Sequence, residues 1–404
     1  MKKLPLPFTV SAIVLLAAFT AFVIWGIPYF FQPVSIVPNA NAFSSQNIRA
    51  SVAQIIDEGQ ITLGENEQLY QVMLVELLEG EYKGILIEVD YGKRQLRNDT
   101  NRFVRGDEIF VLIGKDLDGI LTAHYVDYVR TNPLLILLGV FIVATILMGR
   151  WKGIGSLLAL AFSMTIIIGY IIPHILAGED ALRVSLIGST ILLGTTLYIT
   201  YGWNLKTHAS VLSMVLALLL TGLLSVFFVS LTRLTGLGQE NTLFLMQFSS
   251  VAIDLRGLLL GGMIIGALGV LDDLVSTQSA AVFEIHDANP ALGFRRLFEK
   301  SMRIGRDHVA ATVNTLVLAY TGASLPLLLL FTLGNENYGF LLNLGFMAEE
   351  VVRTLVGSLG LIAAVPITSL IATALALYGD RLGEWRVLLG PATGDGDGEH
   401  RHSH

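Results

Sequence analysis

The chain contains no cysteine and few charged residues. The absence of cysteine excludes disulfides, thiol catalysis and thiolate metal sites. Charged residues make up 15% of the 404 residues, whereas soluble domains carry about 25%. The net charge is −7, with no large basic block outside one loop, so we expect no nucleic-acid partner. No cluster of histidine and acidic residues marks a metal site, and nothing in the sequence calls for a cofactor.

The chain is instead rich in apolar residues, which gather into long runs. Hydrophobic residues make up 53% of the sequence, and the mean hydropathy is +0.64. Segments of about 20 apolar residues can cross about 30 Å of hydrocarbon as helices. The sequence therefore predicts a polytopic α-helical membrane protein of about eight transmembrane helices. The eight predicted spans are Phe8–Phe31, Pro133–Gly149, Ile154–Pro173, Val184–Gly202, Ala209–Leu231, Gly257–Phe283, Val309–Leu333 and Thr354–Tyr378.

The first apolar run can be interpreted as an uncleaved anchor or as a cleaved signal peptide. The run is longer than the apolar part of a usual signal peptide and no A-x-A site follows it, which favours an anchor. Lys and Arg then concentrate in the loops on the side of the N-terminus, which places that side in the cytoplasm. We expect both termini to be cytoplasmic and residues 32–132 to lie outside.

The chain should thus have four parts. These are an anchor at 1–31, an extracytoplasmic β domain at 32–132, a seven-helix transmembrane domain at 133–378, and a partly disordered cytoplasmic tail at 379–404. The outer part holds five strand-like runs, IRASVAQII, LYQVMLVELL, KGILIEVDY, DEIFVLI and GILTAHYVDYV. EGEY and KDLDG look like hairpin turns. We expect a small all-β antiparallel barrel or sandwich, with an OB-like fold among the candidates, which serves as a binding module or as a rigid spacer.

Two adjacent aspartates, Asp272 and Asp273, are the only charged residues between Gly257 and Phe283. They lie close to the middle of that run. An ionised aspartate at the centre of a bilayer costs about 2.5–3.5 kcal/mol on insertion scales, so neighbouring carboxylates there should share protons. The pattern predicts a proton relay or an ion site. The alternative is a pair that caps a broken helix or lies at the membrane interface.

Helical spacing suggests how the two aspartates are presented. Gly262, Gly266, Gly269, Asp273 and Ser276 follow steps of three and four and therefore share one face. Small residues let another helix approach closely, so we expect this face to pack against a helix or a narrow aqueous gap. Asp273 should then point inward and carry the proton. Asp272, turned about 100° away, should tune it or pass the proton on, supported by Ser276 and Thr277.

The following span, which runs antiparallel, offers polar partners at a similar depth. Asn314 and Thr315 should reach the level of the aspartates, and Thr312 belongs to the same small and polar stripe. Ordinary interhelical hydrogen bonding explains this stripe equally well. Between the two spans, Asn289-Pro290 signals a helix start. The basic, amphipathic sequence after it predicts a helix on the inner leaflet, either as an anchor or to transmit motion.

An acidic and basic group precedes the last predicted span. Glu349 and Arg353 have the i,i+4 spacing of a helical ion pair, with Glu350 beside them. Their expected place at the outer end of the span suits a gate, or simply a helix cap.

Two long runs carry a specific resemblance. "IDLRGLLLGGMIIGALGVLDDLVSTQSAAVFEIHDANP" and "IGRDHVAATVNTLVLAYTGASLPLLLLF" resemble the YibE/F-like family of prokaryotic multi-pass membrane proteins. The resemblance covers most of the chain after residue 130. It implies an N-terminal anchor, an outer domain and a polytopic C-terminal region, and no particular activity.

A second resemblance lies in the aspartate helix. "GALGVLDD" followed by a polar helix end is similar to the aspartate-bearing helix of resistance–nodulation–division exporters and of the SecD/SecF translocation motor. There, intramembrane acids carry the protons that drive movement of an outer domain. The resemblance implies that Asp272 and Asp273 bind the proton and that Asn314 and Thr315 pack beside them.

The sequence departs from those proteins in three ways. It has eight predicted spans rather than six or twelve, no lysine in the middle of a span, and an outer domain of only about 100 residues. A second membrane subunit, or a second copy of this chain, could supply the missing half of such a transporter. The expected partners are therefore the lipid bilayer and one of these two subunits.

The function expected from these features is proton-coupled transport, or translocation-motor activity, on an unidentified substrate. The first alternative is a cation channel or carrier, and the second is a non-transporting scaffold or accessory subunit of the envelope. We do not expect an enzyme. Intramembrane acid pairs that cleave peptides lie on two helices, whereas adjacent residues of one helix cannot both face the same water.

Overall fold

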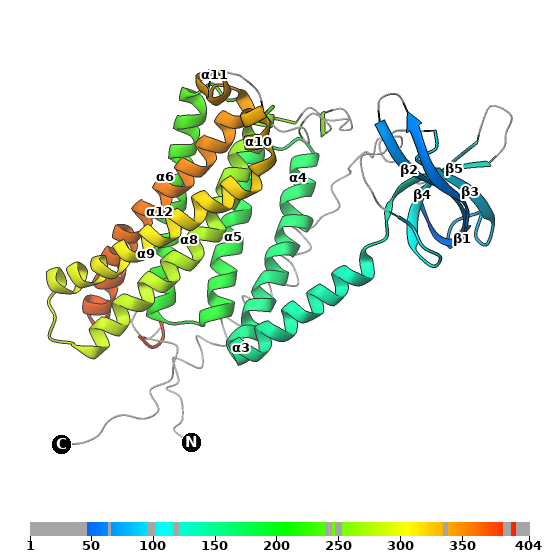
Figure 1. Cartoon of the computed structure of the whole chain (residues 1–404). Coiled ribbons are helices and arrows are strands. Elements are labelled where there is room, and N and C mark those ends of the chain that lie inside the picture. Colours follow the sequence, from blue (N-terminus) through cyan, green and yellow to red (C-terminus); the bar gives the residue numbers. More distant parts are fainter. Residues whose placement is uncertain are drawn as a thin grey trace, which may run out of the picture. The chain divides into compact units, whose positions relative to one another are not determined.

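The computed structural model describes residues 47–63, 66–94, 102–115, 121–238, 242, 245–246, 253–333, 338–382 and 389–392. They form two compact units, which divide within one helix between Ala144 and Thr145. One unit is a β barrel and the other is a bundle of helices (Figure 1). The predicted anchor Phe8–Phe31 and most of the predicted tail lie outside the described residues.

The β unit is a closed five-stranded barrel. Its strands are β1 (Asn47–Leu63), β2 (Asn66–Leu77), β3 (Leu86–Tyr91), β4 (Glu108–Lys115) and β5 (Leu121–Tyr128). They close in the order β1-β2-β3-β5-β4, which confirms the five strand-like runs and a small barrel. The expectation of a wholly antiparallel barrel is wrong in one place, because β3 and β5 pair in parallel. That pairing needs a crossover, such as the Greek-key connection of an OB-like barrel.

The alternation of β3 builds the core of this barrel. Ile87, Val89 and Tyr91 are buried, whereas Leu86 and Glu88 between them are exposed, as the twofold period of a strand requires. The connection from β3 to β4 is held down by one buried amide, that of Gln71 on β2. Its Oε1 accepts a hydrogen bond from the Phe103 N–H at 2.7 Å, and its Nε2 donates to the Phe103 carbonyl at 3.1 Å.

Gln71→Leu should therefore loosen this connection. The buried N–H and C=O of Phe103 would each lose a partner, at about 1–3 kcal/mol per group. We expect tryptic cleavage after Arg102 of the full-length protein to become severalfold faster. Gln54→Leu, at an exposed position of β1, is the matched control. Equal cleavage rates in the two variants would show that the Gln71 amide does not hold the connection.

The helical unit has three long helices at its centre. These are α6 (Leu205–Leu231), α8 (Leu255–Ala288) and α12 (Gly345–Tyr378), which pack against one another. α5 (Ala181–Tyr201) flanks α8, and α9 (Phe294–Ala323) lies against both α8 and α12 (Figure 1). A buried apolar cluster fills the centre; it includes Leu193, Met214, Ile264, Leu271 and Leu361.

The first described helix of this region is broken. α3 (Thr131–Ile166) turns at Arg150, whose φ of 48° and ψ of −128° are not helical. A Cβ at Gly153 would collide with the Thr145 carbonyl, so the turn requires glycine there. The part of α3 after this break continues through a π-helical turn at Ile167–Ile171 into α4 (Ile172–Leu176).

Among the described residues, six helices are long and apolar enough to cross a membrane. They correspond to six of the predicted spans, with ends that differ by a few residues except for the last, which begins nine residues earlier. The six are Thr131–Arg150, Gly153–Leu176, Ala181–Tyr201, Leu205–Leu231, Leu255–Ala288 and Gly345–Tyr378. Together with the barrel, these helices fit a membrane-embedded helical protein with a β domain.

The predicted span Val309–Leu333 is wrong in form. Its first part belongs to α9, which also contains the predicted amphipathic helix as one continuous helix. Its second part is α10 (Leu325–Leu333), and the short α11 (Tyr338–Leu342) follows. The break at Ser324 precedes Pro326, which has no N–H to bond the Gly322 carbonyl and whose ring would clash with that carbonyl in a continuous helix. Asn289-Pro290 lies in the turn before α9 rather than starting the helix.

Candidate proton or ion site on α8

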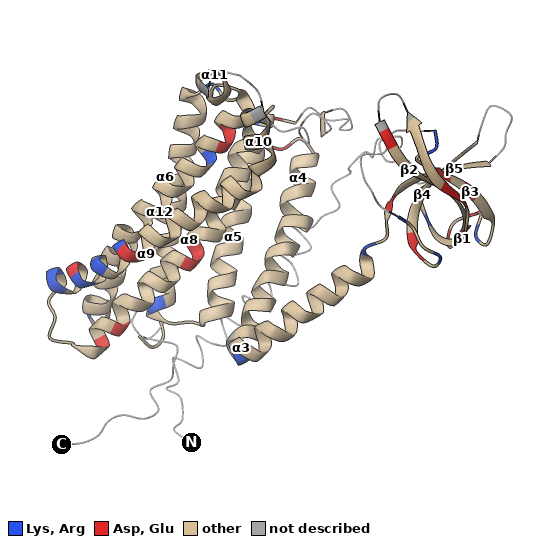
Figure 2. Cartoon of the chain, in the orientation of Figure 1, with Lys and Arg blue, Asp and Glu red and all other residues tan. Residues whose placement is uncertain are grey.

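The aspartate pair lies near the middle of α8. The helix begins at Leu255, where the Asp254 carboxylate caps it by accepting a hydrogen bond from the Arg256 N–H at 3.1 Å. It ends at Ala288, so Asp272 and Asp273 are about half-way along it. Figure 2 shows an acidic patch part-way along α8, away from its ends. The pair therefore lies near the middle of a helix that is long and apolar enough to cross a membrane.

The two aspartates have different surroundings. Asp272 is partly buried, and its Oδ1 is fully buried with no hydrogen-bond partner among the described residues. Asp273 is exposed. The expectation that Asp273 points inward is therefore wrong. The reason is the packing of α8, which buries Ile264, Leu271 and Val275 against its neighbours and leaves the glycine side outside.

The glycine face predicted for close packing is open in the described structure. A Cβ at Gly262 or Gly269 would meet no described atom within 4 Å, and one at Gly266 would meet only the Tyr320 hydroxyl, at 3.5 Å. The glycine of α8 that does allow close packing is Gly261, because a Cβ there would collide with the Ser185 hydroxyl of α5. The sequence contains small residues on both sides of α8, so spacing alone could not decide between them.

The polar residues beside the aspartates lie in two groups. Ser276 is buried, one turn along α8 from Asp272, and its Oγ accepts a hydrogen bond from the Tyr201 hydroxyl of α5 at 3.4 Å. Thr277 is exposed. The side of α8 that carries Asp272 and Ser276 therefore meets α5.

The expected partners on α9 are not joined to the aspartates. Asn314 and Thr315 are exposed, and within the described part of the chain no hydrogen bond links them, or Thr312, to either aspartate. Thr312 donates to the His308 carbonyl at 2.9 Å, and Thr315 donates to the Ala311 carbonyl at 3.0 Å. These are ordinary bonds to the preceding helical turn. The geometry thus does not support the prediction that Asn314 and Thr315 pack beside the aspartates.

A buried amide near the pair escaped the sequence reasoning. Gln278 of α8 is 1% exposed. Its Nε2 donates to the Ser301 carbonyl of α9 at 2.9 Å and to the Ser369 hydroxyl of α12 at 2.8 Å. Gln278 therefore ties three helices together about 9 Å along α8 from Asp272, at 1.5 Å per residue. The sequence feature that could have indicated this contact is an amide within an apolar run, together with serines in two other helices.

The charged residues predicted as a gate all lie on α12, but they make separate contacts. Glu349 is 3% exposed, and its Oε1 accepts a hydrogen bond from the Gly238 N–H at 3.1 Å. Arg353 forms an ion pair with Glu350 at 2.9 Å, with i,i+3 spacing in place of the expected i,i+4 pair. The reason is that the Glu349 carboxylate points to the loop after α6 and binds the Gly238 N–H there, so Arg353 pairs with Glu350 on the same helix. It also lines a cavity of about 760 Å³ there.

Glu349→Ala should release this loop. The Gly238 N–H would lose its acceptor, whereas Glu349→Gln keeps a carbonyl oxygen in its place. Because the chain has no cysteine, a cysteine at Leu234, which is 6% exposed, can report the change. We expect maleimide labelling of that cysteine to become severalfold faster with Glu349→Ala and to change little with Glu349→Gln. Slow labelling in both variants would show that other contacts hold the loop.

Comparison with known proteins identifies the family of this chain. Residues 137–377 match the family described as YibE/F-like protein. Because the match covers more than half of the chain, the chain belongs to this family. No curated protein and no solved structure matches it. Within the described residues, no group of three or more histidine and acidic side chains could hold a metal ion.

Proposed function

We propose that this YibE/F-like protein is a proton-coupled transporter or translocation-motor-like membrane protein in which Asp272 binds and releases the proton. The supporting observation is the buried Oδ1 of Asp272, which has no hydrogen-bond partner among the described residues. It lies near the middle of a helix that is long and apolar enough to cross a membrane. An ionised carboxylate there costs about 2.5–3.5 kcal/mol, and a proton on this oxygen removes that cost.

Asp273 would assist from the exposed side of α8. Two adjacent carboxylates in a low dielectric repel each other when both are ionised. A proton that reaches the exposed Asp273 would therefore favour transfer to Asp272, whose charge is less well solvated. The adjacent positions differ in direction by about 100°, which suits a relay between an outer and an inner side of one helix.

Protonation at Asp272 would reach the rest of the bundle through two contacts. Ser276, one turn away, meets Tyr201 of α5. Gln278 binds Ser301 of α9 and Ser369 of α12. A change in the solvation of Asp272 would shift α8 against α5, and the Gln278 amide would pass this shift to α9 and α12.

The proposal includes a place in the cell. The likeness to YibE/F-like multi-pass membrane proteins supports a prokaryotic inner membrane, and the distribution of Lys and Arg supports cytoplasmic termini and a barrel outside. In that arrangement the barrel would be the part that moves or binds a partner.

The test is proton flux by the full-length protein in liposomes with a pH-sensitive dye inside. We expect an imposed proton gradient to collapse faster with the wild-type protein than in empty liposomes. Flux of another cation that persists without a pH gradient would favour a channel or carrier. Absence of any flux, together with a stable partner of the barrel in pull-downs, would overturn the proposal in favour of a scaffold.

A further inference from the structure

The first half of α9 runs beside the bundle and not beyond its end. Leu297, Ser301 and Gly305 follow steps of four, share one face, and are buried. Leu297 packs in a cluster with Phe283 of α8 and Ala372 of α12, both within helices long enough to span. A Cβ at Gly305 would collide with Val365, which lies thirteen residues before the end of α12, or about 20 Å along it. This half of α9 is therefore level with the last part of the spans.

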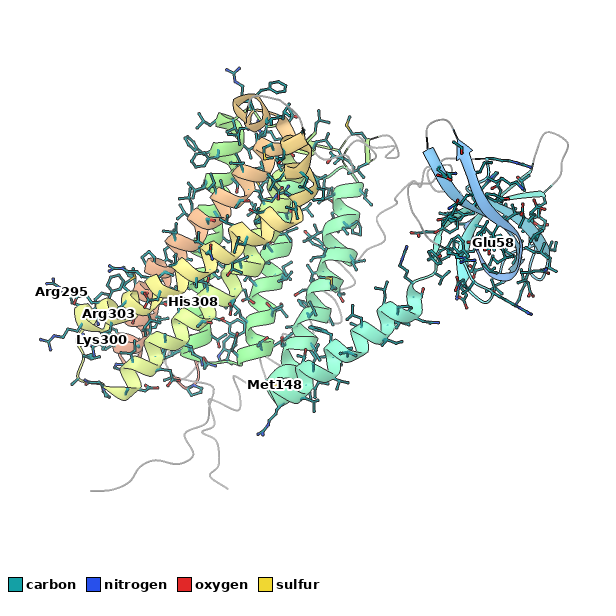
Figure 3. All side chains as sticks on the ribbon, viewed as in Figure 1. Glu58, Met148, Arg295, Lys300, Arg303 and His308 are labelled. Atoms are coloured by element: carbon teal, nitrogen blue, oxygen red, sulfur yellow. The ribbon has the colours of Figure 1, made fainter. Side chains whose placement is uncertain are left out.

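The opposite face of this half is strongly basic. Arg296, Lys300 and Arg303 follow steps of four and three and are all exposed. Within the described part of the chain, none of the three forms an ion pair, whereas the neighbouring Arg295 pairs with Glu299 at 2.9 Å. Figure 3 shows Arg295, Lys300 and Arg303 projecting from this end of α9. Three positive charges without an ion pair in the described structure thus lie on the face of α9 that points away from the bundle.

An aromatic stack lies beside these charges, at the end of α12. The rings of Phe294 and Phe298 are parallel within 6°, and Phe294 also stacks on Tyr378 at the end of α12. The Arg381 guanidinium lies 5.1 Å from the Tyr378 ring. Aromatic rings gather at the headgroup level of membranes. Lys300 and Arg303 lie within about two turns of Phe298, a distance that long cationic side chains can cover by extending toward headgroups.

We propose that Arg296, Lys300 and Arg303 bind the phosphate groups of anionic phospholipids in the leaflet at the α8–α9 end of the bundle. Charge complementarity carries this assignment, because three exposed cations, with no acidic partner among the described residues, lie level with the last part of the spans and next to an aromatic stack. A cytosolic acidic protein would need a face beyond the end of the spans, whereas the packing of Leu297 and Gly305 keeps this half of α9 beside the last part of α8 and α12. The inference is independent of the proton role of Asp272.

The test compares the association of two spin-labelled lipids with the full-length protein in phosphatidylcholine vesicles. The wild-type protein should select phosphatidylglycerol over phosphatidylcholine. The triple variant R296Q/K300Q/R303Q should lose at least about fivefold of this selectivity, since each cation near an anionic surface contributes a similar factor. The matched control R183Q/R233Q/R256Q removes three positive charges from the opposite end of the bundle and should keep the selectivity.

Further measurements separate the alternatives. R296K/K300R/R303K should retain the selectivity, and size-exclusion profiles should show that all the variants stay folded. Selectivity that is unchanged in R296Q/K300Q/R303Q would overturn the proposal and leave an acidic protein as the partner of this face. Displacement of the lipid by millimolar inorganic phosphate would also overturn it, because the site would then recognise free phosphate and not a lipid.

Discussion

Asp272→Asn should reduce proton-driven flux at least about tenfold, whereas Asp273→Asn should leave most of it. The amide of asparagine cannot take up and release a proton near neutral pH. Asp272 holds the buried, unpartnered oxygen, so its loss removes the group whose charge state changes the solvation of α8. Asp273 is exposed, so its loss leaves the buried, unpartnered oxygen of Asp272 in place. The measurement is the initial rate of dye response in liposomes with equal amounts of each protein.

The pair of variants provides its own control. Both remove one negative charge from the same helix and differ by one position, so a general effect of charge would appear in both. Neutralising a carboxylate at this depth should not destabilise the protein, and thermal unfolding in detergent should confirm that Asp272→Asn is at least as stable as the wild type. Loss of flux in Asp273→Asn alone would return the proton role to Asp273, the residue that helical spacing favoured.

The elements that could be predicted are those whose signal lies within one segment. The five strands of the barrel follow from alternation, and six spans follow from the length of apolar runs. The split of Val309–Leu333 was harder to foresee, because the whole run is apolar enough to span. Its break depends on Pro326, which cannot donate the helical hydrogen bond to the Gly322 carbonyl. The continuity of α9 depends on Leu297, Ser301 and Gly305 all packing on one side.

The orientation of the aspartates could not be read from spacing. α8 carries small residues on two sides, with Gly262 and Gly269 on one and Gly261 on the other. The position of α5 decides which side is buried, since Ser185 meets Gly261. The same limit applied to Glu349, whose partner, the Gly238 N–H, is 111 residues away in sequence. The spacing of residues within one helix predicts contacts only between residues that are close in sequence. The contacts of Gly261 and Glu349 instead join separate helices and loops.

Gly305→Leu should strongly destabilise the helical bundle. A Cβ at this position would collide with Val365 and would lie 2.9 Å from the Gln278 Oε1. A leucine would push α9 away from α12 and break the hydrogen bonds of Gln278 to Ser301 and Ser369. Overpacking and the loss of buried hydrogen bonds together should cost about 3 kcal/mol or more. Thermal unfolding of the full-length protein in detergent would show this as a lower midpoint.

Gly322→Leu is the matched control on the same helix. A Cβ at Gly322 meets no described atom within 4 Å, so this variant should gain the same helix propensity without the collision. The double variant G305A/V365A should recover part of the stability lost in Gly305→Ala, because removal of the valine methyl groups makes room for one Cβ. If the Gly305→Leu and Gly322→Leu proteins unfold at the same temperature, α9 is not held by this contact. The Gln278 amide could then not carry a shift of α8 to α9 and α12, and the proposed coupling would have to follow another route.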